Sequence, residues 1–155
     1  MTMRGIPQFN YGTELLMSNE KHHDHGQIRE DFQGGWESDS KNGCTGEGLS
    51  DKQKKAQAFV KKLVNWRKNN PVIHNGELMQ YAPKHDGVYI YFRYTEENSV
   101  MVAFNKNEKA KSLDTGYYYE RLEGFTKGTD VITDKTYTLD NLKIPSRSVL
   151  ILELE

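Results

Sequence analysis

Residues 88–104 read Val-Tyr-Ile-Tyr-Phe-Arg-Tyr-Thr-Glu-Glu-Asn-Ser-Val-Met-Val-Ala-Phe. The two ends of this stretch are rich in β-branched and aromatic residues, whose side chains suit the pleated surface of a strand. The polar Glu96-Glu97-Asn98 between them is a turn signal, so the stretch predicts a β-hairpin. This hairpin indicates that the carboxy-terminal half of the chain is built from antiparallel strands.

Further short apolar runs on both sides of the hairpin predict additional strands. They cover residues 77–81, 111–113, 130–133, 136–139 and 149–154. Residues 117–123 predict a helical turn that Gly124 ends. Many short strands separated by regular turns are typical of an antiparallel sandwich. We therefore predict a β-sandwich domain over residues 71–155.

One helix is predicted before Pro71, from about Ser50 to Asn69. Ser50 and Gln53 have the spacing of a capping box, in which each residue satisfies a backbone donor of the other. Apolar residues recur at helical spacing and form one stripe, which is made of Ala56, Phe59, Val60, Leu63, Val64 and Trp66. This period favours an amphipathic helix with one buried side.

The residues before this helix form no obvious core. Residues 6–16 predict one buried strand followed by a turn, and residues 17–49 are polar and Gly-rich without periodicity. A loop of that length in a compact domain is usually functional or disordered. One strand, one loop and one helix cannot enclose a core. We therefore expect that the isolated chain either self-associates through residues before Pro71 or orders the strand at residues 6–16 poorly.

Charge and composition exclude several classes of partner. The 155 residues include 21 Lys and Arg against 22 Asp and Glu, a net charge of −1. Nucleic acids and anionic membranes require a surplus of Lys and Arg, and neither is expected as a partner. No apolar run is long enough to cross a bilayer. The amino-terminal residues also lack the apolar core of a secretory signal, and the cellular location stays open.

Residues 4–14, Arg-Gly-Ile-Pro-Gln-Phe-Asn-Tyr-Gly-Thr-Glu, resemble the last barrel strand of α-amylase-family glycoside hydrolases. The family follows this strand with a variable loop, here ending at residues 26–36, a closing helix ending near residues 63–68, and a β-sandwich called domain C. The loop is most similar to the cyclomaltodextrinase and neopullulanase branch. The resemblance implies an α+β chain. Residues 1–70 would be the terminal part of a β/α barrel, and residues 71–155 an antiparallel β-sandwich.

This resemblance also implies an activity. Enzymes of the family cleave α-glucosidic bonds in starch-derived glucans or cyclodextrins with retention, using two carboxyl groups about 5 Å apart. In the family these acids follow earlier barrel strands, so no catalytic residue is assigned to this chain. We expect the chain alone to be inactive and its partner to be the missing barrel portion. No cofactor is expected.

Arg29 is the first candidate for a sugar contact that the resemblance implies. In the related branch, an Arg of this loop contacts a sugar and pairs with an acid four positions earlier. The matching position is His25 here, and Asp24 stands beside it. A guanidinium can donate to neighbouring sugar hydroxyls. The alternative is an ion pair with Asp24, Glu30 or Asp31 that anchors the loop.

Three further residues are candidates for roles at the barrel end. Trp36 could stack on a sugar, although packing against the barrel is the favoured interpretation, because a large aromatic residue is usually substantially buried. Tyr11 and Glu14 lie at the strand end, where we expect Tyr11 to face the barrel core or brace neighbouring strands and Glu14 to brace the site rather than catalyse.

Residues 22–25 contain three His and one Asp, but adjacent residues seldom converge on one metal ion, and no metal is expected.

A second function remains open at this point. A stand-alone carbohydrate-binding or interaction module could use Tyr89, Tyr91 and the tyrosines at 117–119 as a platform for sugar rings. The same tyrosines suit a half-buried strand surface. Sequence upstream of this chain would distinguish the two functions, because only the enzyme needs the earlier barrel strands with their acids.

Overall fold

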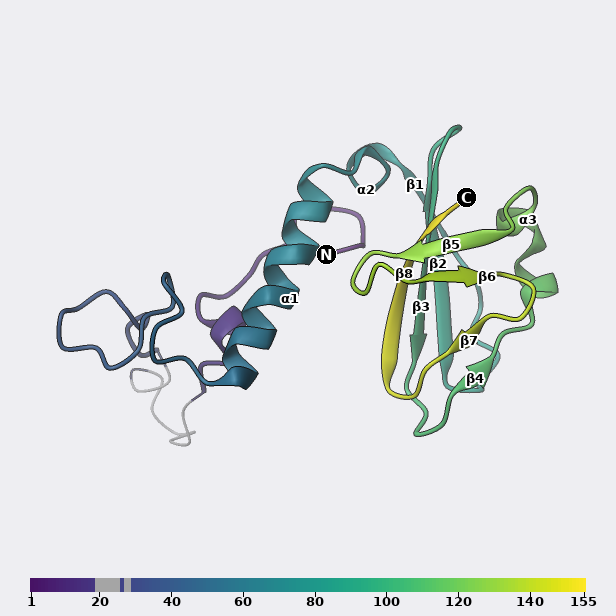
Figure 1. Cartoon of the computed structure of the whole chain (residues 1–155). Helices are drawn as coiled ribbons and strands as arrows, with labels where there is room; N and C mark the ends of the chain where they lie inside the picture. The colour runs from purple at the N-terminus through teal and green to yellow at the C-terminus, as the bar shows by residue number, and fades with distance from the viewer. Residues whose placement is uncertain (19–25, 27–28) are drawn as a thin grey trace. The chain divides into compact units, whose positions relative to one another are not determined.

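The computed structural model describes residues 1–18, 26 and 29–155 (Figure 1). Two compact units divide the chain. The carboxy-terminal unit contains Leu63–Glu155 together with Met1–Ile6, and the loop unit contains Pro7–Lys62. The domain boundary at Pro71 stays a prediction. None of the described helices has the length and apolar character that crossing a membrane requires.

Helix α1 spans Asp51–Lys68, which confirms the helix predicted before Pro71. The backbone N–H of Ser50 donates to Oε1 of Gln53 at 3.1 Å, and the N–H of Gln53 donates to Oγ of Ser50 at 3.3 Å. This capping box satisfies two donors that have no partner within the helix. The short α2, Pro71–Asn75, begins with a proline after Asn70, whose side chain accepts from Val72 N–H at 3.0 Å.

The carboxy-terminal unit contains a six-stranded antiparallel sheet. Its strand order is β1 (Glu77–Gln80), β2 (Val88–Tyr94), β3 (Ser99–Asn105), β8 (Ser148–Leu154), β5 (Lys127–Asp130) and β6 (Thr136–Thr138). The predicted hairpin is confirmed: β2 and β3 pair from Val88 opposite Asn105 to Tyr94 opposite Ser99. A smaller sheet pairs β4 (Lys111–Ser112) with β7 (Lys143–Ile144). Between β4 and β5, the turns η2 (Thr115–Tyr118) and α3 (Tyr119–Leu122) confirm the predicted helical turn.

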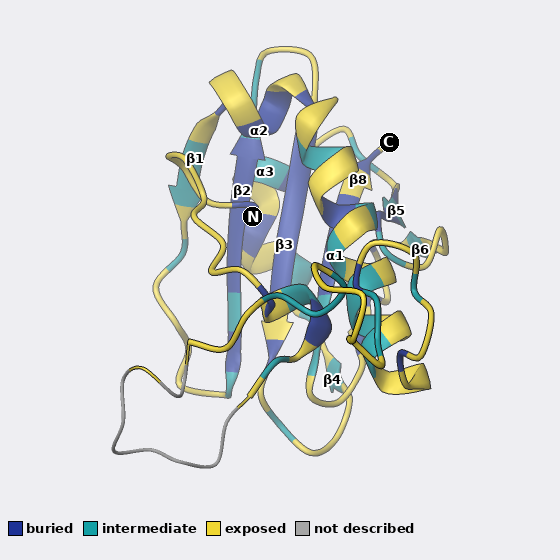
Figure 2. Cartoon of the chain, turned by 90° about the vertical axis from the view of Figure 1, so that its left-hand side faces the viewer, coloured by how far each residue is buried: buried dark blue, intermediate teal, exposed yellow. Residues whose placement is uncertain are grey.

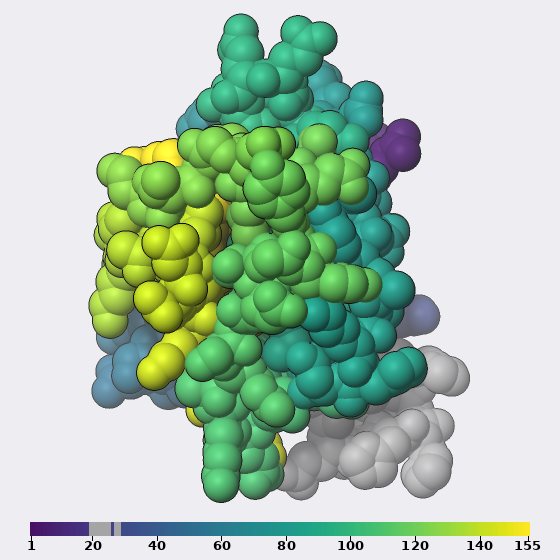
Figure 3. Space-filling model, turned by 90° about the vertical axis from the view of Figure 1, so that its right-hand side faces the viewer, coloured from purple at the N-terminus to yellow at the C-terminus, as the bar shows by residue number. Residues whose placement is uncertain are grey.

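Both faces of the large sheet are buried. On one face Phe92, Met101 and Leu152 are completely buried among side chains that include Leu122 of α3 and Ile144 of β7. Figure 3 shows this covering layer from outside, where the green stretch with η2 and α3 lies beside the yellow end of the chain. Burial on two faces explains why apolar residues run almost without interruption through β2 and β3.

The other face of the sheet packs against helical segments. Tyr91, Val102 and Ile151 form a second apolar cluster with Leu63 at the end of α1 and with residues of α2. In Figure 2, β2 and β3 are buried along most of their length. The sheet therefore lies between two covering layers, one made of helices and one made of short strands and turns.

The amino-terminal segment joins this unit through arginine side chains. Arg93 is 1% exposed and donates to the carbonyl oxygens of Thr2, Gly76 and Glu77 at 3.2, 2.7 and 3.1 Å. Arg67 donates to the carbonyl oxygens of Met1, Met3 and Gly5. Burial lowers the pKa of Arg93, and the nearby Arg67 and Arg4 lower it further. Hydrogen bonds to carbonyl dipoles, rather than a carboxylate, compensate this buried cation.

Two predicted strands differ from the structure. The strand predicted at residues 130–133 is shifted, because Oδ2 of Asp130 accepts from the N–H and hydroxyl of Thr133 at 3.0 and 2.6 Å and turns the chain there. The strand predicted at residues 6–16 is wrong for this chain. This stretch holds only the turn η1 (Thr13–Leu15), and Ile6 is 99% exposed. A parallel barrel strand needs neighbours on both edges, and no described segment pairs with these residues.

Candidate functional site

Asp39 organises the loop that contains the candidate Trp36. Its Oδ2 atom accepts from the backbone N–H groups of Gly34 at 2.7 Å and Trp36 at 3.1 Å. These hydrogen bonds, with that of Gly34 the largest contribution, lower the pKa of Asp39 below its usual 3.8. Hydrogen bonds to a carboxylate stabilise its ionised form. The ionised side chain of Asp39 thus fixes the backbone at Trp36.

Asn42 forms a second polar turn in the same loop. Its Oδ1 atom accepts from the N–H groups of Cys44 and Thr45 at 2.9 and 3.0 Å. The N–H of the intervening Gly43 donates to the Gln33 carbonyl at 2.8 Å. Asn side chains commonly hold turns through such bonds to nearby backbone donors. The described part of the long polar stretch is therefore folded by its own side chains, as in an Ω-loop.

The first turns of α1 hold this loop in place. Gln53 Nε2 donates to the Leu15 carbonyl at 3.0 Å, and Gln57 Nε2 donates to the Gly43 carbonyl at 2.6 Å. A β-carbon at Gly43 would lie 2.5 Å from Leu15 Cδ1 and 2.8 Å from the Phe32 ring. Gly43 is thus required by close packing. The side chains of Leu15 and Phe32 both lie against Gly43.

Trp36 and Arg29 both reach solvent. The Trp36 side chain is 66% exposed, and the choice between packing on a barrel and stacking on a sugar stays a prediction. Arg29 is also exposed, its backbone N–H donates to the Gly26 carbonyl at 3.2 Å, and it belongs to none of the ion pairs among the described residues. Asp24 and His25 lie outside the described residues, as do His22 and His23.

The two strand-end candidates lie in and beside η1. Glu14 is half-buried in this turn, whereas Tyr11 is 49% exposed and does not enter a core. Whether Tyr11 faces a barrel core or braces neighbouring strands stays a prediction, because such neighbouring strands are not among the described segments.

A cleft of about 300 Å³ opens beside this loop. It is lined by Leu16, Met17, Ser18, Glu30, Gln33, Lys41, Lys52 and Gln53. The buried Oε1 atom of Gln33 has no hydrogen-bond partner in the described chain. Neither Arg29 nor Trp36 lines this cleft, so the structure does not bring the candidate residues together there. The described residues also contain no group of three or more His, Cys, Asp or Glu that could hold a metal ion.

Sequence reasoning missed the residues that shape this loop. Asp39 follows Gly34, Gly35 and Trp36 at a spacing that permits a carboxylate to cap a turn, and this signal was available. Gln53 was assigned to the capping box alone, although its Nε2 also holds Leu15. Such a bond between residues far apart in the sequence has no local signal.

Only some of the tyrosines proposed as a platform for sugar rings are exposed to solvent. Tyr91 and Tyr118 are 2% and 6% exposed, and burial raises the pKa of Tyr118 to about 12. Tyr117 and Tyr119 are exposed, but a lysine ammonium already lies 3.9 Å from the ring centroid of Tyr117. The tyrosines therefore do not form one continuous platform for a sugar.

Residues 78–153, which form most of the two-sheet unit described above, match the family of the cyclo-malto-dextrinase C-terminal domain. The chain carries a cyclo-malto-dextrinase C-terminal domain. This match confirms the resemblance to the carboxy-terminal part of an α-amylase-family enzyme and confirms the predicted fold class, a helix followed by an antiparallel β-sandwich.

The curated relatives of this chain include cyclomaltodextrin glucanotransferases. The Klebsiella oxytoca enzyme is 32% identical over 70% of this chain and 15% of its own length. The Niallia circulans enzyme is 27% identical over 93% of this chain and 18% of its own. This chain thus spans less than a fifth of the curated relatives it matches.

A solved structure shows the same fold. The α-amylase from Geobacillus thermoleovorans, complexed with acarbose, superimposes with a TM-score of 0.66 at 17% identity. The superposition covers 99% of this chain and 31% of that chain. At this identity the likeness concerns the fold alone.

Proposed function

We propose that this chain is the carboxy-terminal part of a glycoside hydrolase that cleaves α-glucosidic bonds in starch-derived glucans or cyclodextrins. The observation that carries the proposal is the match of residues 78–153 to the cyclo-malto-dextrinase C-terminal domain. The cyclomaltodextrin glucanotransferases among its relatives support an α-1,4-glucan as the substrate class. Retention of configuration requires two carboxyl groups about 5 Å apart, and we place them in a barrel portion upstream of this chain.

In this proposal the loop unit supplies sugar contacts rather than catalysis. Trp36 offers an exposed ring on a backbone that Asp39 holds in place, and a rigid aromatic face is suited to stacking on a pyranose. Arg29 offers an exposed guanidinium for hydroxyl oxygens. Asp24 and His25 stay as candidate partners of Arg29. Exposed residues on an ordered loop are where this barrel fold places substrate contacts.

Two measurements test the proposal. The chain alone, incubated with maltodextrin, β-cyclodextrin and pullulan, is expected to release no reducing sugar. The chain expressed with its upstream sequence is expected to hydrolyse at least one of them, and NMR should show that the first product retains the α configuration. Turnover by the chain alone that disappears in Glu14→Gln or Asp31→Asn would contradict the placement of the acids.

A variant pair tests the loop contacts in the extended protein. Trp36→Ala is expected to raise KM for maltodextrin by roughly 2- to 13-fold, since aromatic contacts contribute on the order of 0.5–1.5 kcal/mol. Trp66→Phe is the control, because its indole donates to Glu153 at 2.9 Å within the carboxy-terminal unit. Equal effects of both substitutions on KM would contradict a sugar contact at Trp36.

A further inference from the structure

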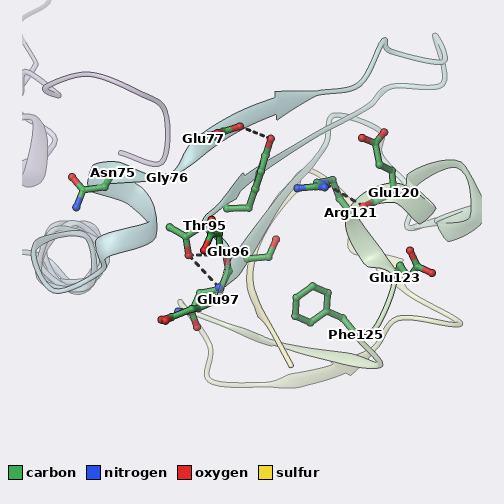
Figure 4. A pocket seen from close by; sticks show the side chains of 13 residues that line it. Asn75, Gly76, Glu77, Thr95, Glu96, Glu97, Glu120, Arg121, Glu123 and Phe125 are labelled. Carbon is green, nitrogen blue, oxygen red and sulfur yellow. Dashed lines mark hydrogen bonds between the residues drawn. The ribbon is translucent and has the colours of Figure 1, made fainter.

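A separate hollow of about 550 Å³ lies in the carboxy-terminal unit, between the β2–β3 turn and α3 (Figure 4). Its walls carry five carboxylates, those of Glu77, Glu96, Glu97, Glu120 and Glu123. Arg121 is the one cationic side chain among the described lining residues, and Phe125 adds an aromatic ring. The lining thus has a formal excess of four negative charges.

None of these carboxylates has an ion-pair partner within the described chain, although Glu77 and Glu123 accept hydrogen bonds from the hydroxyls of Tyr94 at 2.8 Å and Tyr119 at 2.5 Å. The ion pairs among the described residues join Lys84 to Asp114, Lys127 to Glu155 and Arg147 to Glu108, and none of them uses a carboxylate of the hollow. The Arg121 guanidinium instead lies over the Tyr94 ring, 4.1 Å from its centroid, and its Nε donates to the Glu120 carbonyl at 3.1 Å. A hollow walled by one sign of charge concentrates the field and attracts the opposite charge.

The floor of the hollow contains a polar group without a partner. Ser99 lines the hollow and is 7% exposed, and its hydroxyl has no hydrogen-bond partner in the part of the chain that the structure describes. Ser99 pairs with Tyr94 across the β2–β3 ladder, so both side chains leave the same face of the sheet, toward the hollow. A buried hydroxyl without a partner is unfavourable, and a ligand with a hydrogen-bond donor would supply one.

We propose that this hollow binds an organic cation that carries ammonium groups on a methylene chain, either a free polyamine or lysine side chains of a partner segment. Ammonium groups match the carboxylates, which have no ion-pair partner in the described chain, and donate to Ser99, while methylenes pack on Phe125. No three of the described acidic groups converge on one point as a metal site requires, and the volume exceeds that of a single ion. A neutral sugar would leave the carboxylates without countercharge. This inference does not depend on the proposed function.

Titration of the full chain with spermidine, followed by amide NMR shifts, tests the proposal. We expect saturable shifts at Ser99 and Phe125 that weaken as salt is raised. The double variant Glu96→Gln/Glu97→Gln should weaken binding by roughly 2- to 30-fold, because each exposed ion pair contributes modestly. Ser99→Ala should also weaken it without changing the fold. Glu108→Gln, whose carboxylate pairs with Arg147 elsewhere, is the matched control and should leave binding unchanged.

Additional ligands distinguish the source of the cation. A tri-lysine peptide that binds tighter than spermidine would indicate a partner segment, and the reverse order would indicate a free polyamine. The proposal is overturned by three results: shifts that do not saturate, equal weakening in Glu108→Gln, or maltotriose shifting the same amides where spermidine does not.

Discussion

Two phenylalanines show how differently the two units are stabilised. Phe92 in β2 is completely buried, whereas Phe59, in the part of α1 that belongs to the loop unit, is 42% exposed. The carboxy-terminal unit buries apolar side chains on both faces of its large sheet. Among the described residues of Pro7–Lys62, only Leu15 and Leu49 are buried apolar side chains. Apolar burial therefore stabilises one unit, and hydrogen bonds from Asp39, Asn42 and the helix glutamines order the other.

The largest expected effect tests this contrast directly. Phe92→Ala should lower the free energy of unfolding by about 3–5 kcal/mol, because it removes a buried ring and leaves a cavity. Phe59→Ala should lower it by about 0.5 kcal/mol or less, as is usual for exposed positions. Urea unfolding monitored by circular dichroism measures both values. Similar losses for the two variants would show that the loop unit also depends on a packed core.

A second substitution examines the buried cation that ties Met1–Ile6 to the carboxy-terminal unit. Arg93→Met should lower the free energy of unfolding by about 2–4 kcal/mol, because three carbonyls, two of them in buried hydrogen bonds, lose their donor. Arg147→Met is the matched control. It removes only an exposed ion pair with Glu108, for which a change of about 0–1 kcal/mol is expected. A stable Arg93→Met variant with unchanged amide protection at Thr2 would show that the hydrogen bonds of Arg93 are not needed to hold the amino-terminal segment.

The apolar surface before Pro71 predicts self-association of the isolated chain. Its exposed large side chains include Ile6, Phe9 and Phe59. Sedimentation velocity should show concentration-dependent oligomers, and the variant Ile6→Ser/Phe9→Ser/Phe59→Ser should weaken association roughly tenfold or more by removing apolar contacts. Tyr119→Ser, at a 61% exposed position after Pro71, should leave it unchanged. A monomer at every concentration would contradict this prediction.

The smallest effect concerns pH and the loop unit alone. Hydrogen bonds from Gly34 and Trp36 lower the pKa of Asp39, so its stabilising effect is complete above the ordinary value of 3.8 and is lost as the carboxylate protonates below it. Protection factors of the Gly34 and Trp36 amides should fall as the pH is lowered below 3.8, while that of Val102 in β3 should change less. Asp39→Ala should reproduce the loss at neutral pH, and Asp31→Ala should not. Equal protection of Trp36 in wild type and Asp39→Ala would contradict the proposed turn.

Prediction from the sequence succeeded where the signal is local. The capping box of Ser50 and Gln53 and the hairpin around Glu96–Asn98 involve residues a few positions apart, and both are present. Prediction failed where the local structure depends on a neighbouring segment that is distant in the sequence or absent from the described chain. Residues 6–16 have the composition of a buried strand, but strand formation needs paired edges that the described chain does not provide.

For the candidate site, too, local features could be predicted from the sequence and long-range contacts could not. Arg29 and Trp36 could be named from their place in the loop, and the structure shows that both are exposed. Whether they contact one sugar stays a prediction. The bonds that fix the loop, such as Gln57 to the Gly43 carbonyl, link positions 14 residues apart and could not be read from a periodic pattern.

By itself the sequence determined the helix, most of the strands and the family resemblance, because periodicity, capping and turn residues act over short distances. Only the tertiary structure decided which faces of the sheet are buried, that Arg93 reaches three carbonyls, and that Ser99 and five glutamates surround one hollow. The glutamates of this hollow extend from Glu77 through the β2–β3 turn to Glu123, which lies 46 residues after Glu77 in the chain. Their proximity results from strand register and packing, which depend on the whole fold rather than on any local stretch.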